Sequence, residues 1–350
     1  MACVVLPKGK LILPWLRIAC LDASLFGTCP KGQNQDMEQR RMCGIVGLFL
    51  KDQALEPRLG SLLTDMLITM TDRGPDSAGI AIYGAENAAV SKLTVQSDTP
   101  DQAFATLAAD LGAALGSDVH LRRKDTHAVL ELPRGQLSAA STALAGISPD
   151  IRVMSSGDTV EIYKEVGLPT DVAERFDLRA MSGTHGIGHT RMATESLVTT
   201  MGAHPFNTGA DQCLVHNGSL SNHNRLRRKL RREGMQIATE NDTEVGAAYL
   251  TWRMQNGATL GEALEGSLTD LDGFFTFVFG TKDGFGVVRD PIACKPAVMA
   301  ETDQYVAFGS EYRALVNLPG IEQARVWEPE PATVYFWSHG DTSTPTEKAA

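Results

Sequence analysis

The chain has 350 residues, of which 43% are hydrophobic and 21% are charged, and its formal net charge is −10. This composition is ordinary for a globular protein with one large domain or two modest ones. The excess of negative charge argues against a general binder of nucleic acid or of anionic membranes, because like charges repel. No run approaches the roughly 18 consecutive apolar residues that a membrane-spanning helix needs.

The cysteines argue against a disulfide framework or a zinc site, because no two of them form a CxxC pair. Three of the six lie in the first 41 residues, which differ in character from the rest of the chain. A reducing cytoplasm is therefore the simplest compartment for this protein. The six are Cys3, Cys20, Cys29, Cys43, Cys213 and Cys294.

The N-terminal stretch does not resemble a folded segment. Its apolar run LILPWLRIAC is short and is interrupted by Pro14 and Arg17, which is poor for a signal peptide. Two interpretations are open: residues 1–42 are a removable leader, or the start is mis-assigned and Met42 is the real initiator, which we favour. We expect one domain over residues 43–338, with an insert at about 85–180, and a polar tail over 339–350.

The predicted elements begin with a strand over Cys43–Leu50, followed by a helix whose apolar residues recur at helical spacing from Leu59 to Met70. The turn TDRGPDS leads into a second strand, AGIAIYG. From residue 183 onward short strands dominate, with helical stretches only at about 221–233 and 243–254. The absence of regular strand–helix alternation predicts an α+β fold of two packed, largely antiparallel sheets with helices outside. No GxGxxG motif or P-loop supports a nucleotide site.

Cys43 is the first candidate for catalysis. Removal of Met42 would leave Cys43 with a free α-amine, whose pKa of about 7.7–8.0 lies close to the value of about 8.5 for a thiol. One residue would then supply both the nucleophile and its base. The structural alternative is a buried cysteine at the start of a strand.

Four further positions carry groups suited to binding an amino acid or an oxyanion. Arg191, close to Thr194, offers a planar fork for a carboxylate. The Asn217 amide and the Gly218 N–H are suitable oxyanion donors, and Asp242 could bind an ammonium. Taken singly, they could equally be a surface ion pair, a hairpin turn and a helix N-cap.

The order of the motifs resembles the glutaminase domain of the class II glutamine amidotransferases. The motifs are MCGIVGLF, RGPDSAGI, HTRMAT, HPF, HNGSLSN, DTEV and GFGVVRDP, with a later GSE. The resemblance runs from Met42 to about Trp337 and implies a four-layer αββα sandwich of the N-terminal-nucleophile type. It is closest to stand-alone amidotransferase subunits of glutamate-synthase-like or N-methylglutamate-synthase-like systems.

The resemblance also implies roles for individual residues. Cys43 would be the nucleophile, and Asn217 and Gly218 would form the oxyanion hole. Arg191 and the Thr194 region would bind the α-carboxylate of L-glutamine, Asp242 would bind its α-ammonium, and His204 would lie near the site. Met192 and Glu195 depart from the family pattern in the loop that closes over glutamine.

The resemblance further implies a hetero-oligomer in which an ammonia-accepting synthase subunit is the partner. That partner would carry flavin mononucleotide and iron–sulfur centres, whereas this chain is expected to hold no cofactor. The basic run from Arg225 to Arg232 is either a solvated helix face or a docking surface for an acidic partner. Two other functions stay open: a different N-terminal-nucleophile amidohydrolase, and a non-catalytic regulatory subunit on the same fold.

Overall fold

The computed structural model describes residues 42–193, 197–339 and 348–349. The strand predicted at 43–50 is present as β1 (Gly44–Leu50), and the helix predicted from Leu59 is present as α2 (Leu59–Thr69). Within the described ranges, every helix is too short or too polar to cross a lipid bilayer.

A seven-stranded sheet carries the start of the described chain at its centre. The β1 strand lies between β14 and β8, and every pair of neighbouring strands is antiparallel. The spatial order is β15 (Arg325–Trp327), β13 (Val298–Glu301), β14 (Tyr305–Gly309), β1, β8 (His185–Arg191), β2 (Ser77–Tyr83) and β7 (Val160–Val166).

A six-stranded sheet, also antiparallel throughout, faces the first one. Its order is β17 (Lys348–Ala349), β16 (Thr333–Ser338), β12 (Gly284–Arg289), β11 (Gly273–Gly280), β10 (Gln212–Leu220) and β9 (Phe206–Gly209).

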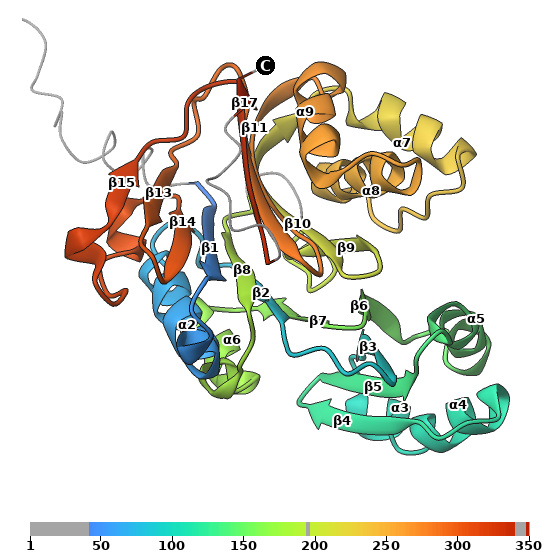
Figure 1. The fold of residues 1–350 in the computed structure, drawn as a ribbon. Coiled ribbons are helices and arrows are strands. Elements are labelled where there is room, and N and C mark those ends of the chain that lie inside the picture. The colour runs from blue at the N-terminus through green and yellow to red at the C-terminus, as the bar shows by residue number, and fades with distance from the viewer. Residues whose placement is uncertain (1–41, 194–196, 340–347, 350) are drawn as a thin grey trace, which may run out of the picture. The chain divides into compact units, whose positions relative to one another are not determined.

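Three apolar clusters separate four layers. Figure 1 shows the two sheets packed together with helices on their outer faces. The cluster between the sheets joins Ile45 and Ile187 of the first sheet to Val215 and Phe285 of the second. On the outer faces, α2 and α6 (Pro169–Arg175) cover the first sheet, and three helices cover the second. These are α7 (His223–Arg232), α8 (Asp242–Gln255) and α9 (Leu260–Asp270). The expected αββα sandwich is therefore confirmed.

The third outer helix, α9, is absent from the sequence-based prediction. Its start carries a capping box, in which the Thr259 hydroxyl accepts from the Glu262 N–H and the Glu262 carboxylate accepts from the Thr259 N–H. This signal was available in the sequence as the pattern TLGE. Short 3₁₀ turns complete the fold: η1 (Gln53–Arg58), η2 (Leu178–Ala180), η3 (Tyr312–Ala314) and η4 (Ile321–Gln323).

Most of the insert expected at about 85–180 forms a small sheet of its own, in the order β4-β5-β3-β6. The connectivity is βαββαβ with all neighbours antiparallel, which is a ferredoxin-like split βαβ arrangement. Leu93 and Leu130 on one face of this sheet pack with helices that bury Leu111 and Leu144. Its elements are β3 (Val90–Gln96), α3 (Pro100–Ala103), α4 (Leu107–Leu115), β4 (His120–Lys124), β5 (His127–Pro133), α5 (Leu137–Ile147) and β6 (Arg152–Gly157).

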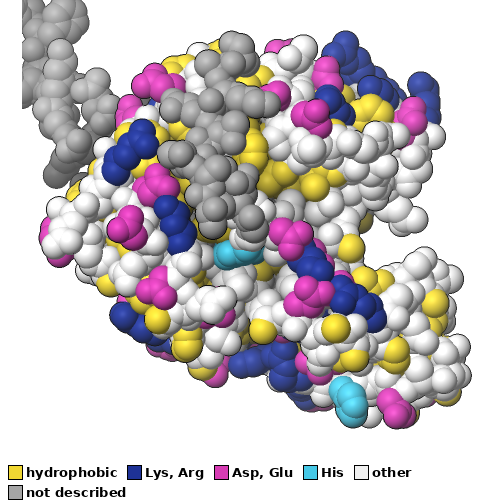
Figure 2. Space-filling view, in the orientation of Figure 1, with side chains coloured by type: hydrophobic (Ala, Val, Ile, Leu, Met, Phe, Trp, Pro, Cys, Tyr) yellow, Lys and Arg dark blue, Asp and Glu magenta, His cyan; other side chains and the backbone are white. Residues whose placement is uncertain are grey.

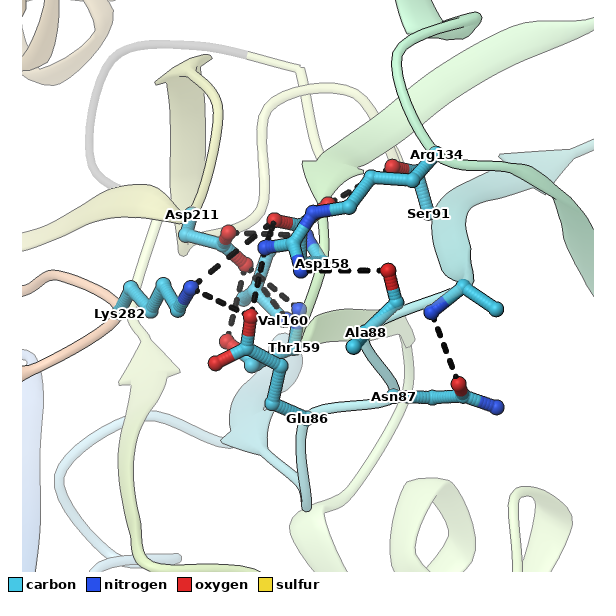
Figure 3. Close-up of polar contacts among 11 residues, drawn as sticks. Glu86, Asn87, Ala88, Ser91, Arg134, Asp158, Thr159, Val160, Asp211 and Lys282 are labelled. Atoms are coloured by element: carbon cyan, nitrogen blue, oxygen red, sulfur yellow. Dashed lines mark hydrogen bonds and ion pairs between the residues drawn. The ribbon is translucent and has the colours of Figure 1, made fainter.

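The small sheet is tied to the sandwich by the carboxylate of Asp211, which lies in the turn between β9 and β10 (Figure 3). This carboxylate accepts from the N–H groups of Asp158, Thr159 and Val160 at 2.8–2.9 Å, and also from the Thr159 hydroxyl. Asp158 in turn binds Arg134 of the small sheet and lies within ion-pair distance of Lys282. The β6–β7 turn therefore connects both sheets of the sandwich to the insert.

We expect Asp211→Ala to lower the free energy of unfolding by about 3 kcal/mol, because three buried N–H donors lose a charged acceptor. Asp211→Asn is the matched control: asparagine also tolerates the left-handed backbone at this position (φ 55°) and keeps one acceptor oxygen. Denaturant unfolding measures the difference, and equal stability of the alanine and wild-type proteins would contradict the assignment.

Candidate active site

Cys43 lies immediately before β1, at the edge of the apolar layer between the sheets. Its side chain is half-buried, and its Sγ lies 3.9 Å from the carbonyl oxygen of Met192, the residue after β8. The register Gly44↔Thr190 brings the start of β1 beside the end of β8, where Arg191 stands. Cys43 and Arg191, which are 148 positions apart in the chain, thus lie side by side at this end of the sheet.

The backbone carbonyl of Cys43 accepts hydrogen bonds from two side chains that come from different parts of the fold. Arg73 Nε donates at 3.1 Å, and Asn217 Nδ2 donates at 3.0 Å. Asn217 is on β10, so the amide reaches across from the second sheet. The position of the cysteine backbone is therefore fixed from both sheets.

Arg73 is a site residue that the sequence analysis quoted within RGPDSAGI but gave no role. It is 4% exposed, and its guanidinium forms an ion pair of 2.6 Å with Glu311. The adjacent Ser310 accepts from the Ile45 N–H at 2.9 Å. The distant RGPD and GSE motifs thus act together on the start of β1.

Asp76 of the same RGPD motif holds the chain just after Arg191. Its carboxylate accepts from the Ala193 N–H at 2.8 Å, and its own N–H donates to the Arg191 carbonyl at 3.1 Å. Arg191 is 7% exposed and belongs to β8. Thr194 and Glu195 lie outside the described residues.

Asn217 and Gly218 lie within β10, not at a strand end or in a hairpin turn as considered from the sequence. Gly218 has a φ of 145°, and a Cβ there would stand 2.0 Å from the Phe274 carbonyl oxygen. Both the backbone conformation and the close approach of β11 therefore demand glycine at this position.

Asp242 is the first residue of α8, but the N-cap is Asn241, whose side chain accepts from the Thr243 N–H. The Asp242 Oδ2 accepts from the Leu220 N–H at 2.9 Å, and its Oδ1 lies 3.8 Å from His216 Nδ1. The capping role considered from the sequence thus falls to its neighbour, and Asp242 is directed to the end of β10.

His204 belongs to a buried group of three histidines around the hydroxyl of Thr243. The His204 Nε2 and the His216 Nδ1 lie 2.8 and 3.0 Å from Thr243 Oγ1, and His204 Nδ1 lies 3.0 Å from His189 Nε2. Burial lowers the pKa of all three, that of His189 to about 3, so they are neutral at pH 7. They position neighbouring groups without adding charge.

The electrostatic environment of the Cys43 thiol combines two opposed effects. Burial raises its pKa above the usual value, while the positive charges of Arg191, Lys295 and Arg73 act to lower it. Lys295, which sequence analysis did not single out, donates to Met42 Sδ at 3.5 Å. Within the described ranges, no three His, Cys, Asp or Glu side chains converge as metal ligands.

The basic run predicted at Arg225–Arg232 forms α7, and dark-blue side chains gather over it in Figure 2. Arg225, Arg228 and Arg232 are exposed and form no ion pair with any carboxylate that the structure describes. Both a solvated face and a docking surface for an acidic partner are compatible with this exposure.

A family model described as a glutamine amidotransferase domain matches residues 189–317. The glutamine amidotransferase-like protein GlxB of Rhizobium meliloti is 70% identical over 298 residues, covering 85% of this chain and 99% of the relative. A putative glutamine amidotransferase of Methanothermobacter thermautotrophicus is 35% identical, covering 84% and 99%.

Among solved structures, the fold is similar to the glutamine phosphoribosylpyrophosphate amidotransferase of B. subtilis, with a TM-score of 0.56 and 19% identity. That match covers 88% of this chain and 49% of the other, so the chain spans about half the length of that protein. At this identity the likeness bears on the fold alone.

We expect Glu311→Gln to destabilise the protein by about 1–3 kcal/mol, because the buried Arg73 guanidinium loses its carboxylate. The matched control is Asp72→Asn, which removes an exposed partner of the nearby Arg313 and should cost less than about 1 kcal/mol. Thermal unfolding of the two variants measures the contrast, and equal losses would show that the Arg73 ion pair is not special.

Proposed function

The chain belongs to the glutamine amidotransferase family, and we propose that it hydrolyses L-glutamine to glutamate through a thioester on Cys43 and delivers the ammonia to a synthase partner. One observation carries this proposal: the Asn217 amide donates to the carbonyl of Cys43, while the Cys43 thiol lies at the end of the strand that bears Arg191. A nucleophile, an oxyanion donor and a carboxylate-binding group thereby meet at one edge of the sandwich.

The base in this mechanism is the α-amine of Cys43, which exists only where no peptide bond precedes the cysteine. We propose that the active form begins at Cys43. Like charges disfavour protonation of an amine, so Arg73, Arg191 and Lys295, which act on the Cys43 thiol, would keep a new amine in its neutral form. The amine then accepts the thiol proton, and the thiolate attacks the side-chain amide carbon of glutamine.

The tetrahedral oxyanion would be bound by the Asn217 amide and the Gly218 N–H. An amide NH₂ has two donor hydrogens, so Asn217 can keep its bond to the Cys43 carbonyl and direct the second to the oxyanion. The proton held by the α-amine passes to the leaving nitrogen, which departs as ammonia. Water then attacks the thioester, releases glutamate and restores the thiol.

Selection of a free amino acid would follow from two opposite charges, those of Arg191 and Asp242. Arg191 would bind the α-carboxylate and Asp242 the α-ammonium, and a glutamine within a peptide lacks both groups. The Asp242 carboxylate is already oriented by the Leu220 N–H at the end of the strand that carries Asn217. The carboxylate proposed to bind the ammonium and the amide proposed to bind the oxyanion are thus both positioned by β10.

The resemblance of the sequence implies a synthase partner that accepts the ammonia. We propose that a separate subunit performs the ammonia-consuming step here. Whether it carries flavin mononucleotide and iron–sulfur centres stays a prediction from the sequence resemblance.

We expect Cys43→Ala to lower glutamate release by at least about 1,000-fold, because the nucleophile and its base belong to the same residue. Cys294→Ser changes an exposed thiol and serves as the control, with activity retained. The protein should be prepared with Cys43 as its first residue, verified by intact mass, and assayed with glutamine. Activity of the same size in protein that retains residues 1–42 would overturn the terminal-amine mechanism.

We expect Asp242→Asn to raise the glutamine KM about 10- to 100-fold, because a charge-assisted bond contributes about 1.5–3 kcal/mol. Asparagine keeps the shape of the side chain and an acceptor for Leu220, so the change removes mainly the charge. Glu240→Gln, two residues away and with an 83% exposed side chain, is the control and should leave KM unchanged. An unaltered KM in Asp242→Asn would instead favour an amidohydrolase acting on other amides.

A further inference from the structure

Lys164 is buried at the outer edge of the seven-stranded sheet, in a row with residues of the site. On β7 it pairs with Gly79 of β2, and Gly79 pairs with His189 of β8. Directly opposed residues of an antiparallel sheet project on the same face. Lys164 and His189 therefore stand on the face that meets the second sheet, with a glycine between them.

The gap over Gly79 is filled by the backbone of the segment 202–206, which follows the loop after β8. A Cβ at Gly79 would lie 2.1 Å from the His204 carbonyl oxygen and 2.5 Å from the Lys164 Cβ. The segment thus packs over Gly79, between Lys164 on one side and His189 on the other.

The Lys164 ammonium binds this segment on both sides of His204. Its Nζ donates to the Ala203 carbonyl at 2.8 Å and to the Pro205 carbonyl at 3.1 Å, and it lies 4.4 Å from the centre of the Phe206 ring.

This placement is energetically unfavourable for a lysine. The residue is 3% exposed and forms no ion pair with any carboxylate in the described ranges. Burial lowers its pKa to about 7, with Glu244 acting in the opposite direction. Burying a lysine without a carboxylate partner costs free energy, which indicates that its hydrogen-bond donors serve a purpose that an apolar side chain could not.

The segment that Lys164 holds contacts Arg191 and the residue next to Asp242. At one end, a Cβ on Gly202 would lie 3.0 Å from a terminal nitrogen of Arg191, so Gly202 packs against the guanidinium. In the middle, His204 Nε2 lies 2.8 Å from the hydroxyl of Thr243, the residue next to Asp242. One short segment thus spans from the proposed carboxylate site to the proposed ammonium site.

We propose that Lys164 is a positioning residue for glutamine binding: it fixes the segment 202–206, which sets Arg191 and Asp242 at the spacing of the two charges of a free amino acid. This inference rests on the proposed function of the site. It also gives the insert a role, because β7 is the strand through which the chain returns from the small sheet to the sandwich.

The test is Lys164→Met, which keeps the length and burial of the side chain but removes the donors. We expect the glutamine KM to rise about 10- to 30-fold with kcat within about threefold of wild type, because the oxyanion donors and Cys43 are untouched. Labelling of Cys43 by iodoacetamide, which carries no amino-acid charges, should keep its wild-type rate. Lys92→Met removes a partly buried lysine of the small sheet that pairs with Glu161 of β7, and is expected to leave KM unchanged.

A second variant and a binding measurement cover the case in which Lys164→Met does not fold. Lys164→Gln retains one donor group and should give a smaller rise in KM. In a Cys43→Ala background, calorimetry should show weaker glutamine binding by the same factor when Lys164 is also replaced.

The possible outcomes separate the two proposals. An unchanged KM and Kd in a folded Lys164 variant would overturn the positioning role while leaving the glutaminase intact. A fall in kcat together with slower iodoacetamide labelling would also overturn it, because it would indicate general distortion of the site. Absence of both turnover and glutamine binding in the unsubstituted protein would overturn the proposed function, and the positioning role with it.

Discussion

The arrangement of the site depends on one backbone carbonyl, that of Cys43. Arg73 reaches it from the turn after α2, and Asn217 reaches it from the second sheet. Because both donors are buried, each would carry a desolvation cost if the carbonyl moved away. The Glu311 carboxylate then holds Arg73, so residues from three distant parts of the chain fix the first residue of the proposed active form.

The layer between the sheets changes from apolar to polar along its length, and the site lies at its polar end. Over most of its length the layer is filled by apolar side chains such as Ile45, Ile187 and Val215. At one end the same alternating positions carry His189, Arg191 and Asn217 instead. Sheet packing supplies a rigid, water-poor frame there, and in such surroundings hydrogen bonds and charges act more strongly than in water. The neutral histidines satisfy polar groups without adding positive charge to that of the nearby cations.

The insert has a different relation to the site from that of the other elements. It folds around its own apolar cluster, yet it returns to the sandwich through a turn that Asp211 holds and a strand that carries Lys164. Its attachment thus reaches the segment 202–206, which connects the groups proposed to recognise the substrate. Through Lys164, β7 thus contacts a segment next to the proposed site, although the insert lies outside the family motifs.

The sequence by itself predicted two packed antiparallel sheets with helices outside, because strand and helix periodicity are local properties. The αββα sandwich and the family were implied by the resemblance of its ordered motifs to a known family. It also contained Arg73 and Glu311 within the quoted motifs, and the capping-box pattern TLGE at the start of α9, although the roles of these residues were not predicted. Only the tertiary structure decided that Arg73 pairs with Glu311 and that Asn217 donates to the Cys43 carbonyl. It also decided that Lys164 donates to the carbonyl groups on both sides of His204. Each of these contacts joins residues on different strands or turns, and sheet order and register, which fix such contacts, depend on the packing of the whole chain.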